Sequence, residues 1–325
     1  MTSVPVNLLT QDHDHYLPLA LGDVSIPGVD LRLRRVRVGT TQGLLERVYT
    51  DPEVDVGEAS FARYVSRIAE GDRSVVALPA FAVRSFRHRC FYVRRGDIND
   101  VSQFRGKTIG ISEWRATGNT WTRAVMSDAG VRTQDCNWIL ARTDSAKKPP
   151  PRDALPANVR FGEDSDTLID LLVAGRIDAF IAPLEPVALY EKDCPFVRLF
   201  DDYPAAERDY FKRTGIFPGH HVVCVKRSFH DAHPDLTWAI YQGLEDSKRS
   251  CDDNAKLFGQ SSPWLLRDLE TAQALMGEDW RPYGVRNNRR MIDALCRELF
   301  EQGLVGRRVE ASELFPEFED AFPMR

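Results

Sequence analysis

Short apolar segments that favour strands alternate with helical patterns along much of the chain, and this alternation most constrains the fold. The run VDVGEASF at 54–61 and the run SVVALPAF at 74–81 are rich in apolar residues, as buried strands are; we expect the second to stop at Pro79. Residues 29–38, VDLRLRRVRV, alternate apolar and basic side chains, which predicts a strand with one solvated face and a bulge where the phase slips at Arg34–Arg35. Strands separated by helices favour a mainly parallel sheet.

A second α/β unit follows. FRGKTIGIS predicts a strand, TGNTWTRAVMSDAGV a helix that starts at Thr117 and is closed by Gly130, and SDTLIDLLVAGRIDAFIAP a helix, a glycine stop and a buried strand. The proline-rich segment over 140–156 is expected to be a surface loop. Further helices are predicted from Pro234 and over 289–303, because apolar residues recur there with helical spacing.

Composition excludes several classes of function. The chain has 325 residues, a net charge of −5 and a pI of about 5.9, which argues against a general nucleic-acid surface. It lacks the glycine loops of NAD or ATP sites and the roughly 18 apolar residues of a membrane span. The N-terminal residues lack a secretory pattern, so we expect a cytoplasmic protein.

Six scattered cysteines without a CxxC pair predict reduced thiols rather than a zinc site or a cysteine nucleophile.

The segment TGIFPGHHVVCVKRS at 214–228 sets two histidines behind a turn and ahead of a β-rich run. Imidazole transfers protons near neutral pH, since its ordinary pKa is about 6.5. Consecutive residues of a strand point to opposite faces. His221 is therefore the candidate acid or base, and His220 is either a substrate contact or a solvent-facing neighbour.

Four segments carry a resemblance to a known family: LPAFAVRSFRHRCFYV, FRGKTIGISEWRATGNTWTR, LLVAGRIDAFIAP and TGIFPGHHVV. The sequence resembles the 4,5-dihydroxyphthalate decarboxylase family over nearly its whole length, most weakly over 140–160 and after 255. His221 aligns with the histidine of the family pattern TGIFPxxH. Near the N-terminus the family tends to have Asp followed by Arg, whereas this chain has Asp14 and His15, which leaves the partner of that carboxylate open.

The resemblance implies an α/β, two-lobed, type 2 periplasmic-binding-protein-like fold, with mixed sheets flanked by helices, two crossover strands and a central cleft. We expect the crossovers at CFYVRR, near 90–95, and HHVVCVKR, near 220–227. One lobe is then 1–89 plus 226–325, and the other is 90–225. The tail 255–325 either covers a lobe or makes a dimer contact, so a homo-oligomer stays open.

The implied function is that of a decarboxylase, a carboxy-lyase that takes CO₂ from a small hydroxylated aromatic acid in the catabolism of aromatic compounds. Direct loss of CO₂ would leave a costly aryl carbanion, so the ring carbon must be protonated first. This chemistry needs an acid, a base and cationic partners for carboxylates. The candidate catalytic residues are His221, His88 and Glu113. Each has a structural alternative, because buried imidazoles are often simply hydrogen-bonded and Glu113 precedes a helix that it could cap.

The candidate substrate contacts include arginines, whose planar fork matches a carboxylate. The set is Arg84, Arg87, Arg123, Asp14, His15, Ser60, Thr117, Trp114, Phe217 and His220. The alternatives are that the arginines are exposed or ion-paired, and that Trp114 and Phe86 pack in the core instead of stacking on a ring.

The turn QDHDHY at 11–16 contains metal-ligand types in Asp12, His13, Asp14 and His15. Its spacing matches no zinc motif, so we predict a reaction without a cofactor; a divalent ion that polarises catechol oxygens is the alternative. The expected partner is a small aromatic acid, with neither nucleic acid nor membrane. Two rival functions are a non-catalytic solute-binding protein of the same fold and another lyase that acts on a small aromatic or menaquinone-type acid.

Overall fold

The computed structural model describes residues 3–37, 43–148, 150, 155–257 and 262–318. The chain forms two compact units. The first comprises the residues up to Arg84, Gly219–Asp293 and those from Val309 onward, and the second comprises Ser85–Pro218 and Ala294–Arg308. No helix in the described residues is both long and apolar enough to cross a membrane.

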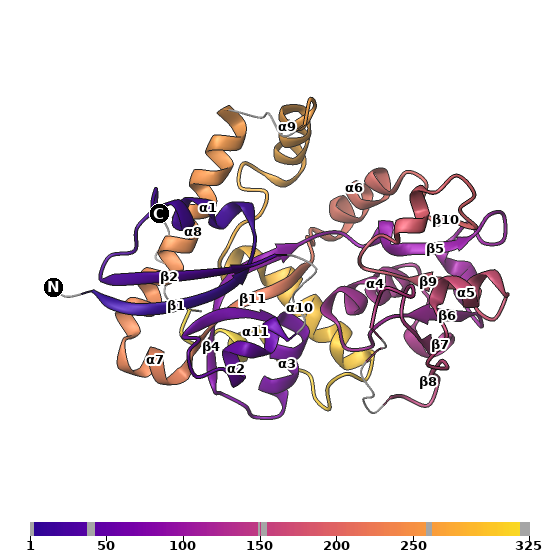
Figure 1. The fold of residues 1–325 in the computed structure, drawn as a ribbon, viewed down its shortest axis with the longest axis horizontal. Helices are drawn as coiled ribbons and strands as arrows, with labels where there is room; N and C mark the ends of the chain where they lie inside the picture. The colour runs from indigo at the N-terminus through magenta and orange to yellow at the C-terminus, as the bar shows by residue number, and fades with distance from the viewer. Residues whose placement is uncertain (1–2, 38–42, 149, 151–154, 258–261, 319–325) are drawn as a thin grey trace. The chain divides into compact units, whose positions relative to one another are not determined.

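The first unit is built on a five-stranded sheet in the order β2-β1-β3-β11-β4 (Figure 1). Its strands are β1 (Val4–Gln11), β2 (Val29–Val36), β3 (Val56–Ser60), β4 (Val75–Arg84) and β11 (Gly219–Lys226). β1 runs parallel to β2 and β3, whereas β11 is antiparallel to both β3 and β4. The carboxyl ends of β1, β3 and β4 and the amino end of β11 therefore share one edge of the sheet, which is where α/β proteins usually carry their ligand sites.

Helices accompany this sheet. They are α1 (Leu17–Leu21), α2 (Arg47–Thr50), α3 (Phe61–Ala69), α7 (Arg227–Ala232), α8 (Pro234–Leu257), α9 (Leu265–Met276) and α11 (Ala311–Leu314). α3 buries Phe61, Val65 and Ile68 on one face, the spacing expected of an amphipathic helix. The helix α10 (Val285–Glu301) begins in the first unit and ends in the second.

The second unit has a six-stranded sheet in the order β10-β5-β9-β6-β7-β8. Its strands are β5 (Phe91–Arg94), β6 (Thr108–Ile111), β7 (Asn137–Leu140), β8 (Val159–Phe161), β9 (Ala179–Ile181) and β10 (Phe196–Arg198), and its helices are α4 (Thr117–Asp128), α5 (Leu168–Val173) and α6 (Tyr203–Thr214). Buried Tyr92, Phe180 and Phe196 pack against Leu168 and Leu172 of α5. Both sheets are mixed and flanked by helices, which confirms the predicted α/β class.

Two local expectations about strands are wrong. The bulge predicted at Arg34–Arg35 is absent, because β2 pairs with β1 in an unbroken parallel register; β2 is an edge strand, where exposed arginines meet water. Pro79 does not end its strand but lies inside β4, which is also at an edge of the sheet. An edge strand tolerates a residue without an N–H. Val38, the last residue of the predicted strand 29–38, lies outside the described residues.

The irregularity in the sheet falls instead at β11. Its register against β4 shifts on either side of His221, and such bulges re-aim side chains next to functional sites. The segments expected to cross between lobes belong to the sheets, with Phe91–Arg94 in the second unit and Gly219–Lys226 in the first. The chain leaves the first unit after Arg84 and returns to it at Gly219.

Candidate functional site

A buried carboxylate, Glu58, lies in the middle of β3, and only 1% of this residue is exposed. An isolated charge at such a position would be very costly, so its oxygens need donors. Oε1 accepts hydrogen bonds from Thr10 Oγ1, from the Gln11 backbone N–H at 2.9 Å and from His13 Nε2 at 2.6 Å. Oε2 accepts from His221 Nδ1 at 3.0 Å. Glu58 therefore joins two imidazoles, one at each oxygen.

The sheet brings these groups together. His221 pairs with Ser60 across β11 and β3, and Glu58 pairs with Val223, so Glu58 and His221 are diagonal neighbours on one face. Leu9 pairs with Gly57, and continuing this register sets Thr10 beside Glu58. The chain then turns directly after β1, which brings His13 over the end of the sheet.

The charge on Glu58 determines the tautomers of both rings. Burial opposes ionisation, yet the hydrogen bonds from His13 and His221 hold the pKa of this carboxyl well below its usual value. An ionised carboxylate only accepts hydrogen bonds. His13 must therefore carry a hydrogen on Nε2, and His221 must carry one on Nδ1. This leaves Nδ1 of His13 and Nε2 of His221 as the ring nitrogens that can exchange a proton with a ligand.

An aromatic cluster surrounds His13. Its ring stacks on His15, with centroids 5.1 Å apart and planes at 15°, and Tyr16 lies edge-on to both rings. His15 is buried, its Nδ1 lies 3.2 Å from Asp14 Oδ1, and burial lowers the pKa of its ring. Arg281 Nη1 lies 4.0 Å from the same carboxylate oxygen. His15 thus supports the His13 ring, and its burial favours the neutral form.

Other predicted residues of the first unit lie at the same edge of the sheet. Ser60 is buried opposite His221, and Arg84 ends β4 opposite Gly219. The Arg84 guanidinium donates to Pro282 O at 3.4 Å and to Asn288 Oδ1. His220 is only 2% exposed, so its interpretation as a solvent-facing neighbour is wrong: both faces of β11 are covered here.

The predicted catalytic residues His88 and Glu113 belong to the second unit. His88 is 4% exposed, packs edge-on against Phe200 and Tyr210, and its Nδ1 has no hydrogen-bond partner in the described structure. Burial lowers the pKa of His88 to about 4, so its ring is neutral at pH 7. The backbone carbonyl of Glu113 accepts a hydrogen bond from Asn119 Nδ2 at 2.6 Å.

Two predicted arginines of the second unit are buried at α4. The guanidinium of Arg87 lies on Gly118, where an added Cβ would be only 2.8 Å from Nη2. Arg123 is fully buried, donates to Gln302 Oε1 at 2.7 Å and to Trp114 O at 2.8 Å, and stacks 4.2 Å from the Trp114 ring. Burial lowers the pKa of Arg123 to about 9. These contacts give Arg123 and Trp114 a packing role within the unit.

The remaining predicted contacts are Thr117 and Phe217. Thr117 is buried at the first turn of α4, and Phe217 packs on Phe86 with ring centroids 4.9 Å apart. Both lie in the second unit. Among the described residues, no group of three or more His, Cys, Asp or Glu side chains is arranged to hold a metal ion.

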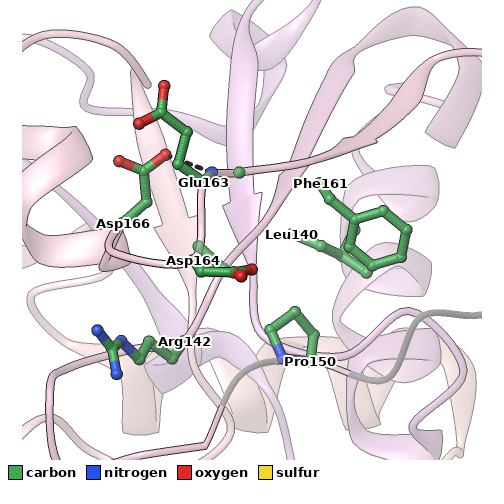
Figure 2. A pocket seen from close by; sticks show the side chains of 9 residues that line it. Leu140, Arg142, Pro150, Phe161, Glu163, Asp164 and Asp166 are labelled. Carbon is green, nitrogen blue, oxygen red and sulfur yellow. Dashed lines mark hydrogen bonds between the residues drawn. The ribbon is translucent and has the colours of Figure 1, made fainter.

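A small pocket in the second unit is too small for an aromatic acid. Figure 2 shows it at the carboxyl ends of β7 and β8, with Glu163, Asp164, Asp166 and Arg142 among the residues that line it. The Glu163 amide donates to Asp166 Oδ2 at 2.9 Å. The volume of the pocket is about 10 Å³, room for one water molecule at most.

Sequence reasoning missed Glu58 altogether and considered His13 only as a metal-ligand type. One signal was available. Glu58 is the only charged residue in the segment VGEAS, and a carboxylate inside an apolar strand is seldom fully buried unless it is paired. Its partners could not be read in the same way, because they lie far from it in the sequence.

Comparison with known proteins identifies the family. No family model matches the chain. The chain is 30% identical to 4,5-dihydroxyphthalate decarboxylase of Comamonas testosteroni, with 97% of each protein covered. It is 26% identical to 4,5-dihydroxyphthalate decarboxylase of Pseudomonas putida, over 65% of this chain and 83% of that protein.

Solved structures show the same fold at low sequence identity. The alkanesulfonate-binding protein SsuA from Xanthomonas axonopodis pv. citri, bound to MOPS, is 13% identical with a TM-score of 0.52, over 97% of this chain and 98% of that one. The periplasmic aliphatic sulphonate binding protein SsuA from Escherichia coli is also 13% identical, with a TM-score of 0.51 over 95% and 91%. The chain thus has the fold of type 2 periplasmic binding proteins, and it belongs to the 4,5-dihydroxyphthalate decarboxylase family.

Proposed function

We propose that this protein is a carboxy-lyase that removes CO₂ from a small hydroxylated aromatic acid of the 4,5-dihydroxyphthalate type. Membership of the family supports the reaction class. The observation that carries the proposal is the hydrogen bond between His221 Nδ1 and the buried Glu58 carboxylate. This pair holds an imidazole with a defined tautomer at the edge of the sheet where ligands usually bind.

The chemistry requires a proton on carbon. Loss of CO₂ from an intact aromatic ring would leave an electron pair on a ring carbon, with nothing to delocalise it. A ring hydroxyl para or ortho to the carboxylate avoids this once it is ionised, because it pushes electron density onto the carbon that bears the carboxylate. That carbon takes a proton, its bond to the carboxylate breaks, the electron pair returns to the ring, and CO₂ leaves. Each turnover consumes one proton.

His221 is the residue that we assign to this protonation. Its Nδ1–H is held by Glu58, so its Nε2 is the nitrogen that carries the transferable proton. The Glu58 carboxylate stabilises the charged ring before the transfer and keeps its orientation afterwards, as an orienting carboxylate does for a catalytic histidine.

Arginine side chains are the candidate partners for the substrate's carboxylates. In the first unit, Arg84 ends the strand that pairs with the start of β11, and its contacts with Pro282 and Asn288 fix its orientation. In the second unit, Arg87 lies against the first turns of α4, where the helix dipole adds to its positive charge. We assign Arg84, which belongs to the same sheet as Glu58 and His221, to carboxylate binding; Arg87 stays a predicted contact.

The direct test is to incubate the purified protein with 4,5-dihydroxyphthalate and to measure CO₂ release and the monocarboxylic product. Phthalate without hydroxyls is the matched control and should release no CO₂. His221→Ala should lower kcat by about 10²–10⁴-fold, the range expected for loss of a general acid. Saturable binding of the substrate without CO₂ release would instead support a solute-binding protein.

A further inference from the structure

We infer that His13 is the base that takes the proton from the ring hydroxyl of the substrate, while His221 gives its proton to carbon. The inference rests on the proposed function and adds a second catalytic residue to it. Its starting point is that Glu58 is hydrogen-bonded to two histidine rings. A carboxylate that only orients a single catalytic histidine would need only one such ring.

The contacts of the two rings with Glu58 are independent of each other. His13 Nε2 lies 2.6 Å from Oε1, and His221 Nδ1 lies 3.0 Å from Oε2. Because each ring has its own oxygen, neither has to leave for the other to bind. The Glu58 side chain is fully buried, whereas the His13 and His221 side chains keep 11% and 17% of their surface exposed. The two rings therefore connect the buried carboxylate to the surface of the sheet edge.

The two rings share one negative charge. Glu58 supplies a single negative charge, which can offset one imidazolium, and a second cation at the same carboxylate would lack compensation. Around His13, burial favours the neutral form of His15, Asp14 is largely exposed to water, and Arg281 is paired with Asp252. The pair therefore suits a reaction in which one ring acts as the acid and the other as the base.

An acid and a base acting together are what decarboxylation of a hydroxylated ring requires. As His13 Nδ1 takes the hydroxyl proton, His221 Nε2 gives its proton to the ring carbon, so the pair never carries two extra protons. The bond to the carboxylate then breaks, CO₂ leaves, and the electron pair restores the aromatic ring as a phenolate. His13 returns its proton to the phenolate oxygen, and one proton from water reloads His221.

The position of the His13 ring is well defined for this role. It is held between Glu58 on one nitrogen and the stacked ring of His15 on one face, with Tyr16 at its edge. His88, the other histidine that the sequence suggested as a catalytic residue, belongs to the second unit and has no carboxylate partner among the contacts found in the described structure.

The test is His13→Gln, because the glutamine amide can still donate a hydrogen bond to Glu58 but cannot act as a base. Decarboxylation is measured on a series of hydroxylated phthalates in which halogen or nitro groups next to the hydroxyl make it progressively more acidic. We expect kcat on the parent substrate to fall by about 10²–10⁴-fold with little change in KM. The deficit should shrink towards none for substrates whose hydroxyl is already ionised, since they need no base.

Two controls make the result decisive. His230→Gln changes a histidine of α7, which follows the carboxyl end of β11 at the opposite edge of the sheet, and should leave kcat unchanged. His13→Phe keeps an aromatic ring against His15 and replaces His13→Gln if the glutamine variant does not fold.

The outcomes separate this inference from the proposed function. An equal deficit across all substrates would show that His13 only positions Glu58, and an unchanged kcat would remove it from the mechanism; either result overturns the inference. A wild-type protein that releases no CO₂ from any member of the series would overturn the proposed function itself.

Discussion

Replacement of Glu58 by glutamine tests whether one buried negative charge organises the site. The glutamine side chain would have the same shape, and its amide oxygen could still accept from Thr10, Gln11 and His13. Its amide nitrogen would then face His221 Nδ1, which is also a donor. The variant therefore removes one charge-assisted hydrogen bond while keeping the packing of β3 in place.

The expected fall in kcat follows from the loss of that single hydrogen bond. A hydrogen bond to a charged group contributes about 1.5–3 kcal/mol. If the bond to Glu58 stabilises the charged form of His221 by this amount, its loss should lower kcat by about 10- to 150-fold, since about 1.4 kcal/mol corresponds to a factor of ten. The effect on stability should be smaller, because removal of a buried charge also relieves its desolvation cost.

The direction in which this stability difference changes with pH is also determined. The pKa of Glu58 is lower in the folded protein than its usual value, so its contribution to stability is present above about pH 4.3, the ordinary pKa of glutamate, and is lost as pH falls through the folded value. The melting temperature of Glu58→Gln should therefore be lower than that of the wild type at pH 7, and the difference should shrink on acidification.

The assay compares CO₂ release and circular-dichroism melting for the wild type, Glu58→Gln and Glu53→Gln. Glu53 is an exposed glutamate in the turn before β3, so Glu53→Gln should match the wild type in both measurements. A Glu58→Gln variant with wild-type kcat would refute the role of the charge. A melting difference that grows as the pH is lowered would refute the assignment of Glu58 as ionised in the folded protein.

Two further predictions concern the second unit. The pKa of His88 falls from 6.5 to about 4 on burial, which corresponds to about 3 kcal/mol at most; this stability is present above pH 6.5 and is lost as the pH falls towards 4. His88→Phe should therefore melt at a higher temperature than the wild type at pH 4.5 but not at pH 7.5, and equal shifts at both pH values would contradict the neutral, buried ring. Arg123→Ala should lower stability by about 3–5 kcal/mol, because it leaves a cavity and two acceptors, Gln302 Oε1 and Trp114 O, without their donor. Urea unfolding monitored by tryptophan fluorescence measures this, and a raised KM with unchanged stability would show that Arg123 binds substrate instead.

Local patterns in the sequence predicted the elements whose character is set by near neighbours. The helix expected from Thr117 is α4, the helix expected over 289–303 lies largely within α10, and the strand after Gly175 is β9. These predictions succeed because helical spacing and glycine stops act within a few residues. The family and its fold were instead implied by the resemblance that the four quoted segments carry.

Expectations that depended on neighbours in space were less successful. The sequence around Pro79 predicts the end of a strand, yet the strand continues through Pro79 because β4 is an edge strand. A solvent-facing His220 was one of the two interpretations of its segment, yet His220 is buried because both faces of β11 are covered. The sequence around either residue contains nothing about the sheet position of its strand.

The clearest case is Glu58. Its place in an apolar strand is a local fact that indicates a buried, paired carboxylate. Its partners Thr10, His13 and His221 come from the end of β1 and the start of β11, and they meet only because the sheet has the order β2-β1-β3-β11-β4. The sequence alone determined that the chain has histidines suited to proton transfer; the tertiary structure decided which two share a carboxylate, because strand order and register bring together residues that are far apart along the chain.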